Sequence, residues 1–179
     1  MIMAKNNSSS RILMIVAQND FRDEEFFEPK KIFESKDAKI SVASLTTNTA
    51  KGMLGGIVKP DVKIADAKVD DYDAIVIAGG MGSKKYLWEN KKLHNLIDEG
   101  KKKKKVIAAI CISPVVLAKT GILKDKKCTV FNDPQSINEI KKYGGIYENK
   151  DVVVDDYIIT ARDPKSAKKF GKEVVKALK

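Results

Sequence analysis

The stretch VIAAICISP, residues 106–114, carries the clearest structural signal in the sequence. Its first five residues form a continuous apolar run, which is typical of a strand covered on both faces of a parallel sheet. Ser113 and Pro114 favour the start of a helix, because serine is a good cap and proline suits the first turn. Cys111 lies at the corner between them, so the stretch predicts a strand, a sharp turn and a helix with a thiol at the turn.

Small residues flank this cysteine where a nucleophile elbow requires them. Ala109 and Ser113 stand two positions before and two after Cys111, giving A-x-C-x-S in place of G-x-S-x-G. A helix N-terminus favours a thiolate, so we expect the pKa of Cys111 to fall. The alternative is a buried inert cysteine, but the carboxyl end of a strand is where open α/β sheets place their sites, which favours function.

The rest of the chain repeats the alternation of strand and helix. Further buried strands are expected at 11–17, 39–45 and 73–80, and amphipathic helices at 23–36, 84–100, 113–121 and in the segment after Asp163. This order predicts an α/β fold, a three-layer sandwich around a mostly parallel, flavodoxin-like doubly wound sheet. Segments 55–67 and 144–161 break the rhythm and suggest hairpins or antiparallel additions at the margin of the sheet.

Local signals give the expected helix ends. Asp23 is the expected cap of the first helix, and Pro29 suggests an irregular first turn. Gly100 and Gly121 are expected to end the next two helices. In the last helix Asp163 should cap and Pro164 should occupy the first helical position.

Length and composition favour one domain. We expect residues 11–179 to form it and residues 1–10 to be disordered. No stretch approaches the roughly 18 apolar residues of a membrane span, and no signal peptide is recognisable, so a cytoplasmic protein without a membrane partner is expected. Cys111 and Cys128 do not form a disulfide framework, and Cys128 is expected at a strand position in the core.

The net charge of +10 does not by itself indicate nucleic acid. Only Arg11, Arg22 and Arg162 are arginines among the 34 basic residues, and lysine lacks the bidentate geometry that reads bases. The run 101–105 has no interleaved aromatic residue and fits a solvated turn at a helix C-terminus. We therefore expect no specific nucleic-acid partner.

Other candidate groups are few. The glycines of AGGMG, residues 78–82, could bring backbone N–H groups to an anion or could simply form a tight turn, and they match no dinucleotide or P-loop pattern. Among Asp23, Glu24 and Glu25, an acid packed beneath a thiolate would have a raised pKa and could donate a proton. His94, the single histidine, is expected at the surface. With two scattered cysteines it makes no zinc site, so neither metal nor cofactor is expected.

Glu25, Gly79–Gly80 and the run from Ala109 through Cys111 to Pro114 together resemble the ThiJ/PfpI superfamily, whose fold is that of class I glutamine amidotransferases. The resemblance implies that Cys111 is the reactive cysteine and Glu25 the acid hydrogen-bonded to it. It also implies that the N–H groups of Gly80 and Ile112 form an oxyanion hole. Members are dimers or larger homo-oligomers, with activities that include handling of glyoxals, deglycation, proteolysis and redox sensing.

Ile112 departs from the pattern of the protease-like branch of this superfamily, and this difference bears on the expected activity. The protease-like branch has histidine directly after the cysteine, and isoleucine cannot accept a proton, although its backbone N–H can still donate to an oxyanion. We therefore favour a cysteine-dependent enzyme, a hydrolase or lyase for small reactive carbonyls or glycated proteins. A non-catalytic redox sensor or chaperone that works through oxidation of Cys111 is the first alternative. An intracellular peptidase is the second, and it would need His94.

Overall fold

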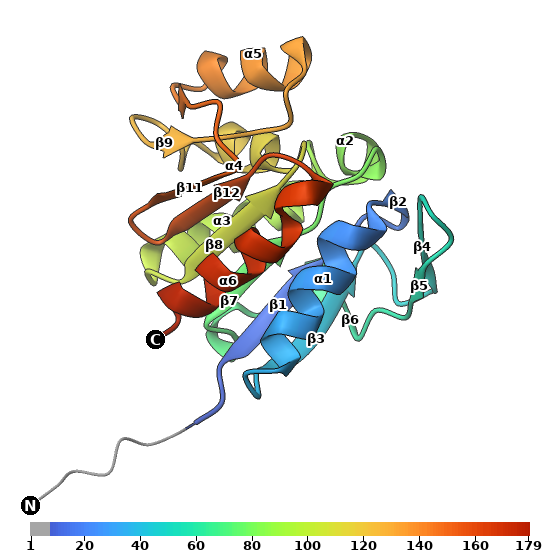
Figure 1. Cartoon of the computed structure of the whole chain (residues 1–179). Helices are drawn as coiled ribbons and strands as arrows, with labels where there is room; N and C mark the ends of the chain where they lie inside the picture. Colours follow the sequence, from blue (N-terminus) through green and yellow to red (C-terminus); the bar gives the residue numbers. More distant parts are fainter. Residues whose placement is uncertain (1–7) are drawn as a thin grey trace, which may run out of the picture.

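A computed structural model describes residues 8–179 and has a seven-stranded central sheet in the order β11-β12-β8-β7-β1-β3-β6 (Figure 1). Its strands are β1 (Arg11–Ile15), β3 (Lys39–Ser44), β6 (Val62–Lys63), β7 (Ala74–Ile77), β8 (Val106–Ile110), β11 (Val152–Asp155) and β12 (Ile158–Ala161). All neighbours pair in parallel except β11, which runs antiparallel to β12. The order β3-β1-β7-β8-β12 is that of a flavodoxin-like doubly wound sheet, as predicted.

Helices cover both faces of this sheet. They are α1 (Asp23–Glu34), α2 (Gly82–Tyr86), α3 (Lys91–Lys102), α4 (Pro114–Thr120), α5 (Pro134–Lys142) and α6 (Ala167–Ala177), with short 3-10 turns at Ile64–Asp66, Val69–Asp71 and Pro164–Ser166. Helices α1 and α6 lie side by side on one face, and α3 and α4 pack on the other, with α5 against α4 (Figure 1). The predicted three-layer sandwich is confirmed.

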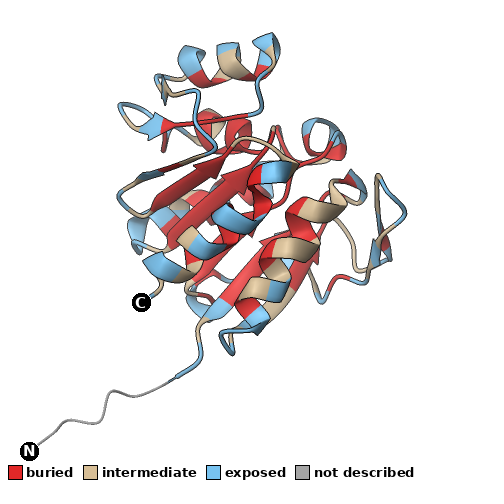
Figure 2. Cartoon of the chain, viewed as in Figure 1, coloured by how far each residue is buried: buried red, intermediate tan, exposed pale blue. Residues whose placement is uncertain are grey.

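Burial on both faces explains the continuous apolar strands. In β1, Ile12 and Met14 join the core under α1 and α6, whereas Leu13 and Ile15 join the core under α3 and α4. All four side chains are fully buried, and Figure 2 shows the sheet buried along nearly its whole area. Because successive side chains of a strand point into one apolar core and then the other, neither face of the sheet is polar, and the strands appear in the sequence as unbroken runs of apolar residues.

The irregular segments are only partly marginal hairpins. β11 and β12 form the expected antiparallel addition at the sheet edge. In the other segment, β5 (Ile57–Val58) pairs antiparallel with β4 (Ala50–Gly52) in a small sheet that also holds β2 (Asn19–Phe21), whereas β6 joins the central sheet in parallel. Cys128 lies fully buried in β9 (Lys127–Cys128), which pairs with β10 (Ile146–Tyr147), so its predicted core strand position is confirmed.

Helix α1 begins differently from the expectation. Arg22, not Asp23, occupies the cap position. The carboxylate of Asp23 instead accepts hydrogen bonds from the N–H groups of Leu54 (2.8 Å) and Gly56 (2.7 Å), so it ties the β4–β5 loop to the helix. Pro29 lies in the interior of α1 rather than in its first turn. Its missing N–H releases the carbonyl of Glu25 from the usual helical bond without ending the helix.

The expected helix at 84–100 is two helices, α2 and α3, separated by a turn. Gly100 does not end α3, which continues to Lys102, because a glycine inside a helix lowers its stability without preventing it. Gly121 does end α4, with a φ of +86° in the left-handed region. Asp163 acts as a cap through a bond from the Ser166 N–H, but the segment that it caps is the 3-10 turn Pro164–Ser166, and the last helix α6 begins after it at Ala167.

Residues 1–7 of the expected disordered segment lie outside the described residues. Ser10 is placed by a bond in which the N–H of Lys39 donates to its carbonyl, at 2.8 Å. Across residues 8–179, the structure has no helix that combines the length and the apolar character needed to cross a membrane.

Candidate active site

Cys111 occupies a strained turn between β8 and α4. Its φ of +65° lies in the left-handed region, which costs a residue with a side chain on the order of 1 kcal/mol or more. Two backbone bonds hold it there: the Cys111 N–H donates to the carbonyl of Ala161 (3.0 Å), and the Phe131 N–H donates to the carbonyl of Cys111 (2.7 Å). The sharp elbow predicted from the sequence is therefore present, and the thiol lies at the carboxyl end of a central strand.

Ser113 ties the elbow to the loop after β7. Its hydroxyl donates to the carbonyl of Ala78 (2.6 Å) and lies 2.8 Å from the hydroxyl of Ser83. Both serines are fully buried. The small residue expected at this position thus also joins the two loops that border the thiol.

Glu25 reaches the same place from the first turn of α1. Its side chain is fully buried, and within residues 8–179 neither carboxyl oxygen has a partner with conventional hydrogen-bond geometry. A Cβ on Gly79 would lie 2.4 Å from the Glu25 Oε2 and 2.5 Å from the Cys111 Cβ. Gly79 must therefore lack a side chain for the acid and the cysteine to meet.

Burial dominates the ionisation of this pair. It raises the pKa of Glu25 to about 8, although the nearby Cys111 thiol and Gly79 N–H act in the opposite direction. The prediction of an acid with a raised pKa beneath the thiol is confirmed. Near pH 7 the carboxyl group keeps its proton and can donate it.

The prediction that the pKa of Cys111 falls is wrong in this structure. Burial raises it, the Glu25 carboxylate raises it further, and the backbone N–H groups of Gly80 and Ile112 oppose this with a smaller effect. The side chain is only 8% exposed, so the lost hydration of a thiolate outweighs what the helix N-terminus offers.

The backbone N–H groups of Gly80 and Ile112 both lie near the sulfur of Cys111 and favour its thiolate. Gly80 has a φ of +105°, and a Cβ there would lie 2.3 Å from the backbone nitrogen of Arg22, so only glycine fits. Two N–H groups near one point can stabilise negative charge on the oxygen of a substrate carbon that has bonded to the sulfur. All four residues named from the sequence, Cys111, Glu25, Gly80 and Ile112, are thus brought together.

A cleft of about 450 Å³ opens beside the elbow. It is lined by Arg22, Glu24, Phe131, Asp163, Pro164 and Lys165. Arg22 donates to Glu24 through Nε (2.8 Å) and Nη2 (3.0 Å), and its backbone N–H donates to the carbonyl of Gly79 (2.9 Å). Two residues that line the cleft therefore bond to the site: Arg22 to the carbonyl of Gly79, and Phe131 to the carbonyl of Cys111.

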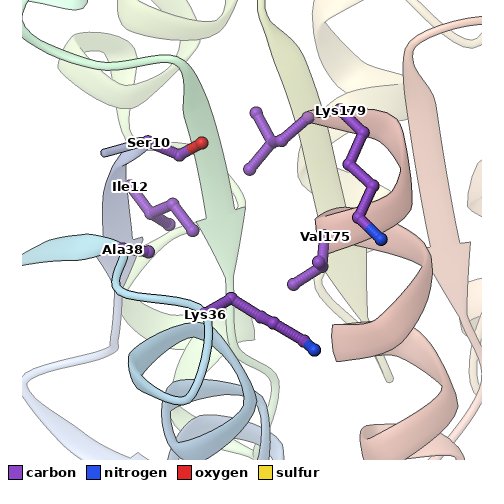
Figure 3. Close-up of a pocket in the computed structure, with 7 residues that line it drawn as sticks. Ser10, Ile12, Lys36, Ala38, Val175 and Lys179 are labelled. Atoms are coloured by element: carbon purple, nitrogen blue, oxygen red, sulfur yellow. The ribbon is translucent and has the colours of Figure 1, made fainter. Parts of the chain in front are cut away.

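Another cavity, of about 200 Å³, lies at the other end of the sheet (Figure 3). Its apolar lining comes from Ile12, Ala38 and the end of α6, and its charged groups are Lys36 and Lys179. It borders the start of β1, whereas the carboxyl ends of the strands carry the cysteine site. The reactive groups are therefore not part of this cavity.

His94 is buried, so its predicted surface position is wrong. It is 8% exposed, and its Nε2 lies 2.7 Å from the carbonyl of Trp88. Trp88, the single tryptophan of the chain, donates from Nε1 to the carbonyl of Ile112 at 3.0 Å. Sequence reasoning missed Trp88, Arg22 and Phe131. Only the rarity of tryptophan and arginine in this sequence could have drawn attention to the first two.

The sequence model that describes the DJ-1/PfpI family matches residues 10–177 of this chain. An uncharacterised protein of Methanocaldococcus jannaschii is 52% identical over 97% of this chain and 85% of its own length. One of Archaeoglobus fulgidus is 30% identical over 93% and 98%.

Solved structures agree. A ThiJ/PfpI domain protein from Brachyspira murdochii has a TM-score of 0.91 at 31% identity, covering 96% of this chain and 98% of the other. Drosophila melanogaster DJ-1beta has a TM-score of 0.86 at 28% identity, covering 96% and 91%. The match extends over nearly the whole chain, including the elbow, the acid and the glycine loop, and the protein belongs to the DJ-1/PfpI family.

Proposed function

We propose that the protein is a cysteine-dependent enzyme, a hydrolase or lyase that acts on small reactive carbonyls or glycated adducts. One observation carries this proposal: a strained cysteine, a buried acid and two backbone N–H groups converge on one point. The acid has a pKa near 8 and can exchange a proton near neutral pH.

The proposed chemistry begins with addition of Cys111 to the carbonyl. A C–S bond forms, the C=O π bond breaks, and the N–H groups of Gly80 and Ile112 hold the developing oxyanion. Glu25 donates its proton to that oxygen and takes the proton that the thiol loses, so the step leaves the net charge unchanged. With methylglyoxal, Glu25 would next give its proton to the ketone oxygen while it takes the C–H proton of the adduct. It would then deliver that proton to the neighbouring carbon while it takes the proton of the first hydroxyl group, and water would release lactate and the free thiol from the resulting thioester.

The cleft beside the elbow supports small, uncharged substrates. Arg22 and Lys165 balance the charges of Glu24 and Asp163, and Phe131 contributes an aromatic surface that is 39% exposed. A cavity of about 450 Å³ exceeds the needs of a small dicarbonyl, which leaves room for an adduct carried on a protein side chain.

Incubation with methylglyoxal and an assay for lactate test the proposal. We expect the wild type and Cys128→Ala to form lactate and Cys111→Ala to lose this activity, because only Cys111 borders the acid and the two N–H groups. A wild type that forms no more lactate than Cys111→Ala would refute the proposal.

Oxidation of Cys111 to sulfinate, in a redox sensor or chaperone, is the second candidate. The observation that favours it is a difference in exposure between the two thiols. Cys111 is 8% exposed and its carbonyl accepts a bond from Phe131, which lines the open cleft, whereas Cys128 is fully buried. With hydrogen peroxide as the oxidant, we expect the mass gain on Cys111 alone at a low dose. Equal oxidation of both thiols would contradict this function.

A peptidase is disfavoured by the position of His94. Peptide hydrolysis by a thiol needs a base near the sulfur, yet the residue after the cysteine is Ile112 and the His94 ring bonds to the carbonyl of Trp88. Proteolysis of casein that survives in His94→Ala would exclude His94 as the base.

We also propose that the protein is a cytoplasmic homo-oligomer, a dimer or larger. Leu54, Ile57 and Met81 are large apolar residues that are more than half exposed, which supports a surface covered by another subunit. Sedimentation velocity at micromolar concentration should give at least twice the mass of the chain, and a monomer would contradict the proposal.

A further inference from the structure

The elbow is held by hydrogen bonds at three backbone groups of Cys111 and Ile112. The Cys111 N–H donates to Ala161, and the Cys111 carbonyl accepts from the Phe131 N–H. The third group is the carbonyl of Ile112, which accepts from the Trp88 indole at 3.0 Å and from the Val115 N–H at a longer 3.3 Å. The Trp88 indole is a side-chain donor, whereas the other partners are backbone groups, so a substitution can remove this bond without altering the backbone.

The orientation of residue 112 matters because its N–H lies near the sulfur of Cys111. Rotation of the peptide that joins Cys111 to Ile112 would turn this N–H away from the thiol. The bond from the Phe131 N–H to the Cys111 carbonyl holds that peptide itself. The bond from Trp88 to the Ile112 carbonyl holds the next peptide, so the two bonds together fix the peptide planes on both sides of the Ile112 Cα.

Trp88 is itself firmly placed. Its side chain is 5% exposed, its backbone N–H donates to the carbonyl of Ser83 (3.0 Å), and its carbonyl meets the Nε2 of His94 at 2.7 Å. His94 comes from α3 and is also buried. The chain of contacts therefore runs from α3 through His94 and Trp88 to Ile112 at the elbow.

We propose that Trp88 is a positioning residue that holds the Ile112 N–H in place beside Cys111, and that His94 fixes Trp88 for this task. The inference rests on the proposed function for its catalytic consequence only. Trp88 does not touch the reacting atoms, and it acts through the backbone of Ile112. The same bond would explain why the single histidine of the chain is buried although it is not a base for the thiol.

Trp88→Phe tests the proposal, because it removes the indole N–H and keeps an aromatic ring. We expect alkylation of Cys111 by iodoacetamide to be about threefold slower at a fixed pH, with its pH midpoint shifted upward, because a misplaced N–H stabilises the thiolate less. With methylglyoxal we expect kcat about tenfold lower and KM nearly unchanged, since the N–H acts on the transition state.

Tyr147→Phe is the matched control, since it removes a polar aromatic atom in β10, and its alkylation profile should equal that of the wild type. A Trp88→Phe profile that also superimposes on the wild type would overturn the proposal. If Trp88→Phe does not fold, His94→Leu and His94→Gln decide the matter. The proposal requires the wild-type profile in His94→Gln, which retains a donor, and slower alkylation in His94→Leu. Equal profiles in these two variants would overturn it.

The alkylation measurement needs no turnover, so it separates the two proposals. A wild type without lactate formation but with slower alkylation in Trp88→Phe would refute the enzyme and support the positioning role. If wild type and Trp88→Phe form lactate equally and have identical alkylation profiles, the enzyme proposal is supported and the positioning role of Trp88 is refuted.

Discussion

At the scale of single residues, the site depends on one acid and one thiol that share a buried place. Glu25 and Cys111 cannot both be ionised there at low energetic cost, because burial penalises each charge and each charge penalises the other. Below about pH 8 the acid holds its proton. The pair therefore combines a proton donor with a nucleophile rather than two anions.

Glu25→Gln should make Cys111 easier to alkylate. The carboxylate is the second largest cause, after burial, that raises the pKa of Cys111, and an amide of the same shape carries no charge. At a fixed pH above about 8, where the Glu25 carboxyl group of the wild type is ionised, removing a repulsion worth one pKa unit gives about tenfold faster alkylation by iodoacetamide. Lactate formation should fall in the same variant, since the proton donor is lost.

Glu24→Gln is the control for that experiment. Glu24 lies on the same helical turn, but it is partly exposed and paired with Arg22, so its loss should change the alkylation rate of Cys111 little. Slower alkylation in Glu25→Gln, or an equal acceleration in both variants, would contradict the assigned role of Glu25.

Gly79→Ala should remove activity by separating the acid from the cysteine. The new Cβ would lie within 2.5 Å of the Glu25 carboxylate and the Cys111 Cβ, and such an overlap typically costs about 1–3 kcal/mol of unfolding free energy. Gly100→Ala, in α3, is the control, because the tightest neighbour of its Cβ is the mobile end of Ile75 at 3.2 Å. Lactate formation and urea unfolding measure both effects, and full activity in Gly79→Ala would contradict the geometry.

Identities at the site and the raised pKa of its acid could be predicted from the sequence, but the ionisation of Cys111 and the burial of His94 could not. Cys111, Glu25 and the glycines follow from the elbow pattern and the family resemblance, since both depend on residue type and order. The pKa of Cys111 and the burial of His94 depend on which segments pack over them. Trp88 and Phe131 contact the elbow from 24 and 20 positions away along the chain, a proximity that the local sequence pattern does not contain.

At the scale of elements, the first turn of α1 organises two regions. Glu25 points into the site, while Asp23 holds the loop between β4 and β5 through two N–H groups. The sequence suggested a cap for Asp23 because acids are common at helix starts for electrostatic reasons. Its true partners are 31 and 33 residues away, so only the folded chain identifies them.

Asp23→Ala should destabilise the protein by about 2 kcal/mol, because hydrogen bonds to a charged acceptor are stronger than neutral ones and two N–H groups lose their partner. Urea unfolding measures the change. Glu28→Ala, on the same helix, is the control and should shift the midpoint much less. An Asp23→Ala midpoint equal to that of Glu28→Ala would show that the loop contact contributes little.

At the scale of the whole molecule, the doubly wound sheet explains why the site forms where it does. Parallel strands β1, β7 and β8 end at the same edge, so the segments that follow them carry Glu25, Gly79–Gly80 and Cys111 to one place. Connections leave β1 and β7 toward opposite sides of the sheet, which opens space between them. This arrangement could be predicted, because continuous apolar strands alternating with helices allow few topologies.

The stability of the whole molecule should carry the signature of Glu25. Its pKa is about 8 in the folded chain and near 4.5 without burial, so between these values the unfolded chain loses a proton that the folded chain keeps. The unfolded state is then favoured progressively as the pH rises, by about 1.4 kcal/mol for each unit of pH. Urea unfolding of the wild type and Glu25→Gln from pH 4.5 to 8 measures this. The wild type should lose stability relative to the variant across that window, because glutamine does not titrate. A difference that stays constant, or that grows in favour of the wild type, would mean that Glu25 is ionised in the folded protein.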